Sequence, residues 1–337
     1  MLFSQDIGID LGTANTLVCV KGKGIVIREP SVVALDVRMT PPKVVAVGDE
    51  AKKMIGRTPG SITAVRPLKD GVIADFNITS DFLRALVRKA MAGSPLARVR
   101  VMITIPSSVT EVERKAVHDA AKSAGARYVS LIKEPMAAAI GAGLPVAEAT
   151  GSMIVDIGGG TCEVAVVSLG DIVTSRSIRM AGDKFDDAII AYVRRKYNLL
   201  IGERTAEELK ISIGSAYPYP NEGKATVRGR NLLDGLPKNV EVTAEDIRDA
   251  LEDPLTQIVE TVRTTLEKTP PELASDIVDR GIILTGGGAL LRGLDRLIAQ
   301  EVGITVKIAK NPLDCVVAGT AICLEKDSLN INGKRNG

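Results

Sequence analysis

The sequence predicts an α/β fold made of two similar halves, and three observations support this. The first is a glycine-rich hairpin, Ile154 to Val167, in which an acid, three glycines and a threonine stand between two apolar strands. The second is a shorter copy of this pattern, Asp6 to Val20, whose acid Asp10 precedes Asp156 by 146 residues. The third is the length of 337 residues, which exceeds one typical domain. We therefore expect each half to contribute one hairpin to a shared ligand site.

The hairpin that contains Gly158, Gly159 and Gly160 has the features of a phosphate-binding turn. Glycines let the backbone approach a ligand closely, and consecutive N–H groups in such a turn can surround an anion. Asp156 ends the first strand, where a carboxylate can hold a divalent cation through water, and Thr161 adds a hydroxyl. An ordinary hairpin explains this segment equally well by itself, because it matches neither GxxxxGK[ST] nor GxGxxG.

Two other segments strengthen the phosphate interpretation. The N-terminal copy sets Asp10, Gly12 and Thr13 between apolar strands, as the second hairpin does. A third glycine turn, Thr285 to Gly288, follows a buried strand and precedes apolar residues at helical spacing. This turn is expected to open a helix whose positive end suits a nucleotide.

The first half, residues 1–145, alternates strands and helices and is expected to be completed by residues 310–326. A small subdomain is expected over residues 30–75. Thr110 and Glu113 match a capping box at the start of a helix. The remaining expected elements are strands at 7–11, 17–20, 25–28, 99–105 and 128–132, an amphipathic helix at 82–90 and a small-residue helix at 137–142.

The second half, residues 146–310, is expected to carry its own small subdomain at 182–243. Thr205 and Glu208 match another capping box, which would place Glu207 and Lys210 on one helix face. Spacing alone favours a solvated ion pair for those two residues. A long apolar-faced helix is expected at 247–266, and the polar residues 327–337 are expected to form a disordered tail.

Composition excludes several classes of function. Apolar residues make up 45% of the chain and aromatic residues 3%, with no Trp, so single-stranded nucleic acid would find few stacking platforms. The net charge of +2 argues against a basic nucleic-acid surface. Four cysteines without CxxC spacing are expected to be small buried residues rather than zinc ligands. We find neither a signal peptide nor a transmembrane stretch, which predicts a cytoplasmic protein.

The three glycine segments, in this order, resemble the actin-like ATPase superfamily, and longer motifs resemble its MreB family of bacterial actins. The resemblance extends from Asp6 to about Glu325. Besides the hairpins it rests on four segments: Thr58-Pro59-Gly60, residues 66–76 (RPLKDGVIADF), residues 134–140 (EPMAAAI) and residues 284–293 (LTGGGALLRG).

The resemblance implies an actin-like fold that binds ATP and Mg²⁺ in a cleft between the halves. Asp10 and Asp156 would hold Mg²⁺ through water, Glu134 would position the attacking water, and Thr161 would assist it. In relatives, the acid and the lysine that match Glu207 and Lys210 reach the nucleoside. The resemblance therefore favours nucleotide binding by these two residues over a solvated ion pair. The implied nucleotide-binding residues are Asp10, Gly12, Thr13, Ala14, Asn15, Gly158, Gly159, Gly160, Thr161, Glu207, Glu208, Leu209, Lys210, Gly286, Gly287, Gly288 and Ala289.

The function implied by the resemblance is that of an ATP-hydrolysing filament protein. It would polymerise with itself on the inner face of the cytoplasmic membrane, work with membrane proteins of cell elongation, organise cell-wall synthesis and keep cells rod-shaped, without nucleic acid as a partner. One rival on the same scaffold is a small-molecule kinase, which would need a carboxylate base facing a sugar. The others are a chaperone, although no substrate-binding region follows Glu325, and a DNA-segregating actin, which the charge does not support.

Two segments are candidates for contact with an anionic membrane. Met1, Leu2 and Phe3 precede polar residues and are too few to form an amphipathic helix. In the loop 91–98, Met91 and Leu96 could enter the lipid interface while Arg98 and Arg100 meet anionic head groups. An ordinary surface loop is an equally good interpretation of this segment. Such contacts are weak for one monomer, and a filament would multiply them.

Overall fold

The computed structural model describes residues 4–57, 60–91 and 98–333. Internal contacts divide the chain into two compact units. Unit 1 comprises Met1–Thr150, Val167–Ile172 and Leu313–Gly337, and unit 2 comprises Gly151–Val166 and Val173–Pro312. The division falls at residue 150 rather than 145, and residues 167–172 group with unit 1. The candidate loop 91–98 and residues 1–3 lie almost wholly outside the described residues.

Unit 1 is built on a five-stranded sheet in the order β10-β9-β1-β2-β3. The pairs β1/β2 and β2/β3 are antiparallel, whereas β9 and β10 run parallel to β1. The strands are β1 (Ser4–Leu11), β2 (Asn15–Val20), β3 (Gly24–Pro30), β9 (Arg98–Ile105) and β10 (Tyr128–Lys133).

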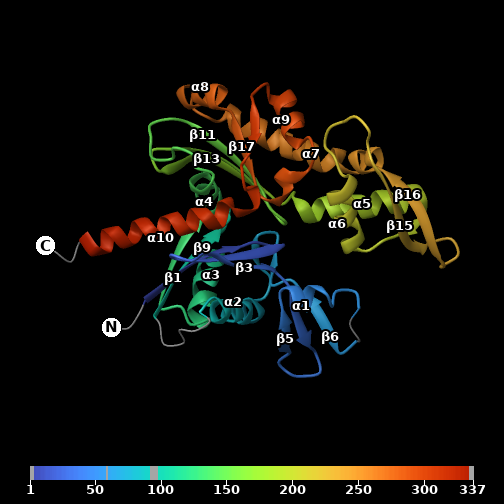
Figure 1. Ribbon diagram of the computed structural model, residues 1–337, viewed down its shortest axis with the longest axis horizontal. Coiled ribbons are helices and arrows are strands. Elements are labelled where there is room, and N and C mark those ends of the chain that lie inside the picture. Colours follow the sequence, from blue (N-terminus) through green and yellow to red (C-terminus); the bar gives the residue numbers. More distant parts are fainter. Residues whose placement is uncertain (1–3, 58–59, 92–97, 334–337) are drawn as a thin grey trace. The chain divides into compact units, whose positions relative to one another are not determined.

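Helices cover both faces of this sheet (Figure 1). Side chains alternate along a strand, so Val18 of β2 joins the core beneath α2 (Phe76–Ala90) and α3 (Glu111–Ser123), while Cys19 packs with Val317 on the other face. The Asp75 side chain caps α2 by accepting from the N–H of Ile78 at 2.9 Å. The predicted capping box of Thr110 and Glu113 is confirmed at α3.

The opposite face carries α4 (Glu134–Gly141) and α10 (Cys315–Gly333), which lie side by side (Figure 1). Their crossing depends on glycine. A Cβ at Gly319 would lie 1.9 Å from the carbonyl oxygen of Ala137, and one at Gly141 would lie 1.8 Å from that of Cys315. The helix backbone of α10 continues beyond Lys326, where the sequence indicated a disordered tail, so that expectation is corrected for residues 327–333.

The small subdomain of unit 1 contains a three-stranded sheet in the order β5-β4-β6 and a short helix. Its elements are β4 (Val33–Asp36), β5 (Lys43–Val47), α1 (Asp49–Lys52) and β6 (Ile62–Val65), followed by the hairpin of β7 (Leu68–Lys69) and β8 (Val72–Ile73).

Unit 2 repeats the sheet order of unit 1. The order of its sheet is β18-β17-β11-β12-β13. As in unit 1, three strands that are consecutive in the chain lie side by side, and two later strands extend the sheet beyond the first of them. Strands β17 and β18 run parallel to β11. The strands are β11 (Ser152–Ile157), β12 (Cys162–Ser168), β13 (Asp171–Ile178), β17 (Ile282–Thr285) and β18 (Val306–Ile308). The α/β fold with two similar halves is confirmed.

The other elements of unit 2 form its helices and its small sheet, β14-β15-β16. The helices share one continuous aliphatic core with the five-stranded sheet. They are α5 (Gly182–Tyr197), α6 (Glu203–Ile213), α7 (Ala244–Glu267), α8 (Pro271–Arg280) and α9 (Leu294–Val302), with 3-10 turns η1 (Gly287–Leu290) and η2 (Pro312–Asp314), and the small strands are β14 (Leu199–Leu200), β15 (Lys224–Asn231) and β16 (Pro237–Thr243).

Two local expectations in unit 2 are wrong. Helix α6 begins at Glu203 with Gly202 at its N-cap, so Thr205 lies inside the first turn and forms no capping box with Glu208. The third glycine turn opens the 3-10 turn η1, and the α-helix begins only at Leu294. Cys19, Cys162 and Cys315 are buried, as expected of all four cysteines, whereas Cys323 is half-buried. Within the described ranges, no helix combines the length and the apolar character needed to cross a membrane.

Candidate nucleotide-binding site

The glycine hairpin of unit 2 forms a tight turn between β11 and β12. The N–H of Gly158 donates to the carbonyl of Thr161 at 2.9 Å, which closes the turn. Gly160 and Thr161 are buried, while Gly158 and Gly159 are half-buried. A turn of this kind presents backbone rather than side chains to a ligand.

The first turn of α5 rests on this glycine turn. The N–H groups of Gly182 and Asp183 donate to the carbonyls of Gly158 and Gly159 at 3.1 and 2.8 Å. A Cβ at position 182 would lie 3.3 Å from the Gly158 oxygen, so glycine allows this close approach. The position of the glycine turn is therefore tied to that of α5.

Asp156 lies at the end of β11 and is 6% exposed. Its Oδ1 accepts a hydrogen bond from the hydroxyl of Thr285, on the neighbouring parallel strand β17, at 2.8 Å. Burial raises the pKa of Asp156 to about 6, the Thr285 hydrogen bond opposes this rise, and the nearby charge of Glu163 adds to it. A buried carboxylate of this kind would be stabilised in its charged form by a cation.

The third glycine turn packs directly against the end of β11. Gly286 has φ +79°, and a Cβ there would lie 2.3 Å from the carbonyl oxygen of Ile157. A Cβ at Gly288 would meet the Ile157 side chain at the same distance. Within η1, Gly287 precedes Gly288 and Ala289 is fully buried in the core. The second and third glycine turns therefore adjoin each other within unit 2.

Of the four residues predicted on α6, the structure brings Lys210 toward the glycine turn. Its Nζ donates to the carbonyl of Gly182 at 3.1 Å and lies 2.9 Å from Oδ1 of Asp186. Glu207 is close enough to Asp186 to influence its pKa. The structure places Glu208 in an exposed ion pair with Arg204, whereas Leu209 points into the core.

The hairpin of unit 1 has a related arrangement. Asp10 is the last residue but one of β1, and its Oδ1 accepts a hydrogen bond from the Thr104 hydroxyl of β9 at 3.3 Å. The carbonyl of Gly12 accepts a bond from the Ser31 hydroxyl at 2.6 Å, and the carbonyl of Ala14 accepts one from the Ser31 N–H at 2.9 Å. These bonds hold the turn against the start of the small subdomain.

The other residues predicted in unit 1 occupy different positions around the hairpin. Thr13 is buried, and its hydroxyl accepts from the N–H of Gly71 at 3.0 Å. Asn15 is exposed at the start of β2. Glu134 is the first residue of α4 and is 8% exposed. Because Ile9 pairs with Ile103 and Lys133 with Ile105, the ends of β1, β9 and β10 share one sheet edge, the usual ligand edge of parallel strands.

An acid–threonine pair therefore occurs once in each unit, Asp10 with Thr104 and Asp156 with Thr285. In both, the acid lies one residue before the end of its strand, and the threonine lies on the neighbouring parallel strand. The sequence indicated Thr285 only as the start of the third glycine turn, and Thr104 not at all. Their only signal was a polar residue at the end of a buried strand, which becomes informative once the strand pairing is known.

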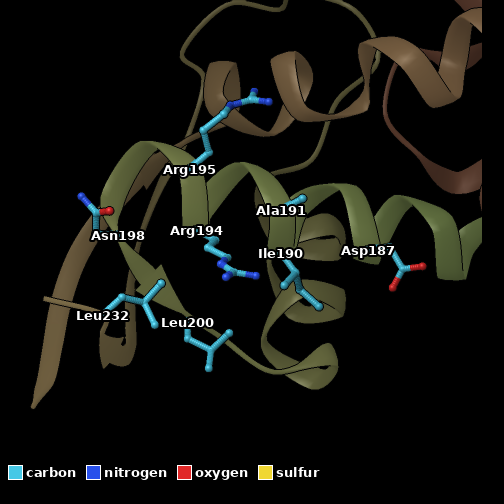
Figure 2. A pocket seen from close by; sticks show the side chains of 8 residues that line it. All are labelled: Asp187, Ile190, Ala191, Arg194, Arg195, Asn198, Leu200 and Leu232. Atoms are coloured by element: carbon cyan, nitrogen blue, oxygen red, sulfur yellow. The ribbon is translucent and has the colours of Figure 1, made fainter. Parts of the chain in front are cut away.

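A pocket of about 530 Å³ lies elsewhere in unit 2, beside α5 and β14 (Figure 2). Figure 2 shows the Arg194 side chain directed toward it and the Arg195 side chain directed away. None of the predicted nucleotide-binding residues contributes to it. Its lining consists of Asp187, Ile190, Ala191, Arg194, Arg195, Asn198, Leu200 and Leu232.

Comparisons with known proteins identify the family of the chain. The family model described as MreB/Mbl protein matches residues 4–331. The chain is 57% identical over 327 residues to the cell shape-determining protein MreB of Escherichia coli strain K12, covering 96% of this chain and 94% of the relative. It is 52% identical over 324 residues to the cell shape-determining protein Mbl of Bacillus subtilis strain 168, covering 96% and 97%.

Solved structures show the same fold. MreB5 of Spiroplasma citri bound to ADP superposes with a TM-score of 0.93 at 42% identity, covering 98% of both chains. The MamK double helical filament superposes with a TM-score of 0.81 at 22% identity, covering 96% of this chain and 99% of the other. The fold is thus actin-like. With a family model that spans nearly the whole chain and relatives more than half identical over 96% of it, the chain belongs to the MreB/Mbl protein family.

Proposed function

We propose that this chain binds and hydrolyses ATP with Mg²⁺ and assembles with further copies of itself into filaments. The observation that carries the nucleotide proposal is the acid–threonine pair beside a glycine turn, which occurs in both units. The S. citri relative solved with ADP and with AMPPNP supports the choice of an adenine nucleotide.

Each proposed ligand group has a role that its surroundings support. The glycine turns, Gly158–Gly160 and the turn after Asp10, offer backbone N–H groups to phosphate oxygens. Asp10 and Asp156 hold Mg²⁺ through water, and the buried position of Asp156, with its raised pKa, favours a nearby cation. When bound, Mg²⁺ neutralises charge on the transferred phosphoryl group.

The proposed hydrolytic residues are Glu134 and Thr161. Phosphoryl transfer depends mainly on positioning and charge stabilisation, so a carboxylate that orients water needs no covalent step. Glu134, at the ligand edge of the sheet of unit 1, accepts the hydrogen bond that orients the attacking water. The Thr161 hydroxyl, at the exit of the glycine turn, assists it. Glu207, Glu208, Leu209 and Lys210 of α6 and Gly286–Ala289 complete the nucleotide-binding set.

At the cellular level, we propose that the filaments lie on the inner face of the cytoplasmic membrane, act with membrane proteins of the elongation machinery and organise cell-wall synthesis. Relatives more than half identical that are named cell shape-determining proteins support this proposal. Electron microscopy of the purified protein with ATP, with and without anionic vesicles, tests filament assembly and membrane binding together.

The nucleotide proposal is tested by Asp156→Ala. We expect the variant to lose Mg²⁺-dependent ATP binding in calorimetric titration, because the buried carboxylate is removed while the glycine turn is kept. Asp279→Ala, which changes an exposed acid of α8, is the matched control and should bind as the wild type does. Unchanged affinity and magnesium dependence in Asp156→Ala would remove this hairpin from the proposed site.

A further inference from the structure

The ion pair of Asp186 and Lys210 joins helices α5 and α6 next to the glycine turn. Asp186 follows Gly182 by one helical turn, and the two side chains of the pair are only 13% and 17% exposed. Nζ of Lys210 lies 2.9 Å from Oδ1 of Asp186 and donates to the carbonyl of Gly182 at 3.1 Å. The ammonium group therefore bridges the Asp186 side chain and the first residue of α5.

Gly182, the first residue of α5, is itself hydrogen-bonded to the glycine turn Gly158–Gly160. The N–H groups of Gly182 and Asp183 donate to the carbonyls of Gly158 and Gly159 at 3.1 and 2.8 Å. Gly182 thus accepts from Lys210 on one side and donates to the glycine turn on the other. A displacement of the Lys210 side chain would therefore move the peptide groups at the start of α5, and these groups contact the Gly158–Gly160 turn.

The ionised form of the Asp186 side chain depends on Lys210, because the other charges around it are negative. Burial raises the pKa of Asp186 to about 6, Lys210 opposes the rise, and the charges of Glu207 and Asp183 add to it. The carboxylate is therefore ionised near neutral pH and becomes protonated as the pH falls below about 6. Below about pH 6 the ion pair with Lys210 therefore weakens, and with it the hold on the Gly182 carbonyl.

We propose that Asp186 is a positioning residue of the nucleotide site, whose carboxylate holds the Lys210 ammonium against the Gly182 carbonyl and so fixes the first turn of α5 on the Gly158–Gly160 turn. The inference rests on the proposed ATP binding. Asp186 acts through Lys210 and the backbone, so its effect falls on the fit of the phosphate turn rather than on the chemical step.

The test is Asp186→Asn, which keeps the size of the side chain and removes its charge. We expect ATP affinity at pH 7.5 to fall about tenfold, since an ion pair with little exposure is broken, while the rate of phosphate release at saturating ATP changes little. Asp186→Glu should recover part of the affinity. Asp187→Asn, which removes the exposed neighbouring acid paired with Lys184 at 3.1 Å, is the matched control and should match the wild type.

Two further measurements separate positioning from a general loss of structure. Lys210→Met should cost at least as much ATP affinity as Asp186→Asn, because Lys210 also belongs to the proposed nucleotide-binding set. The double variant should lose no more affinity than Lys210→Met alone, because Asp186 acts only through Lys210. The difference in ATP affinity between the wild type and Asp186→Asn should narrow from pH 7 to pH 5, because Asp186 becomes protonated in the wild type over this range. Asp156 titrates in both proteins and therefore does not contribute to the difference.

Amide hydrogen exchange without nucleotide supplies a readout independent of ATP. Exchange at Gly182 and Asp183 should be about tenfold faster in Asp186→Asn than in Asp187→Asn, because these N–H groups bond to the glycine turn. Unchanged exchange together with wild-type ATP affinity would overturn the inference, as would additive losses in the double variant. A wild-type protein that fails to bind ATP would instead overturn the proposed function.

Discussion

Asp246 anchors a polar cluster that ties α7 to α5, and its removal should destabilise unit 2. The carboxylate is 3% exposed, forms an ion pair with Lys196 and accepts a hydrogen bond from the Tyr197 hydroxyl at 2.6 Å. It also completes the capping box of α7 with Thr243. Burial raises its pKa, but bonds from Lys196, Thr243 and Tyr197 outweigh this and lower the pKa to about 2.

The lowered pKa sets the size of the expected effect. A fall from 3.8 to about 2 corresponds to roughly 2.4 kcal/mol of stability at neutral pH. Lys196 is half-exposed, so solvent screening reduces the expected loss in Asp246→Asn to about 1 to 2 kcal/mol. Because the pKa is lowered on folding, this stability is present above pH 4 and is lost as the pH falls toward 2. At pH 3 roughly half of it should remain.

The assay is urea unfolding followed by tyrosine fluorescence at pH 7 and pH 3. Four of the five tyrosines lie in unit 2 and the chain has no Trp, so the signal reports mainly on that unit. Asp253→Asn, an exposed acid on the same helix, is the control and should change stability by less than about 0.5 kcal/mol. A loss in Asp246→Asn that equals the control, or that is the same at both pH values, would refute the role of the charge.

Three other outcomes follow from the proposed site. Glu134→Ala should bind ATP normally yet release phosphate more slowly at matched polymer concentration, and equal release would remove Glu134 from the mechanism. Thr285→Val should raise the pKa of Asp156 further above its ordinary value, because an opposing hydrogen bond is lost, so ATP affinity should fall more steeply than in the wild type between pH 8 and pH 6; parallel pH profiles would contradict this. Leu96→Ser with deletion of residues 2–3 should stop filaments from sedimenting with anionic vesicles while ATP binding persists, and undiminished sedimentation would place the membrane surface elsewhere.

The sequence predicted those parts of the fold and of the site that depend on short, continuous segments of the chain. Each of the two hairpins, whose repetition predicted two similar halves, and the capping box at Thr110 depend on residues close together in the chain. The capping box at Thr205 was wrong because its spacing also fits residues inside a first helical turn, and Gly202 begins α6 instead.

Partners that lie far apart in the chain escaped prediction. Thr104 and Thr285 lie 94 and 129 residues from the acids that they contact, and only strand pairing brings them together. Asp186 was one acid among several on α5. Its significance follows from Lys210, which another helix delivers to it.

The return of α10 to unit 1 has a consequence for folding during synthesis. Residues 313–333 emerge from the ribosome after all of unit 2, yet Val317 of α10 covers Leu17 and Cys19 on one face of the first sheet. Unit 2 can therefore complete its core while that face of the earlier unit is still open to solvent. The nascent chain would expose apolar surface during this interval, when chaperones bind most readily.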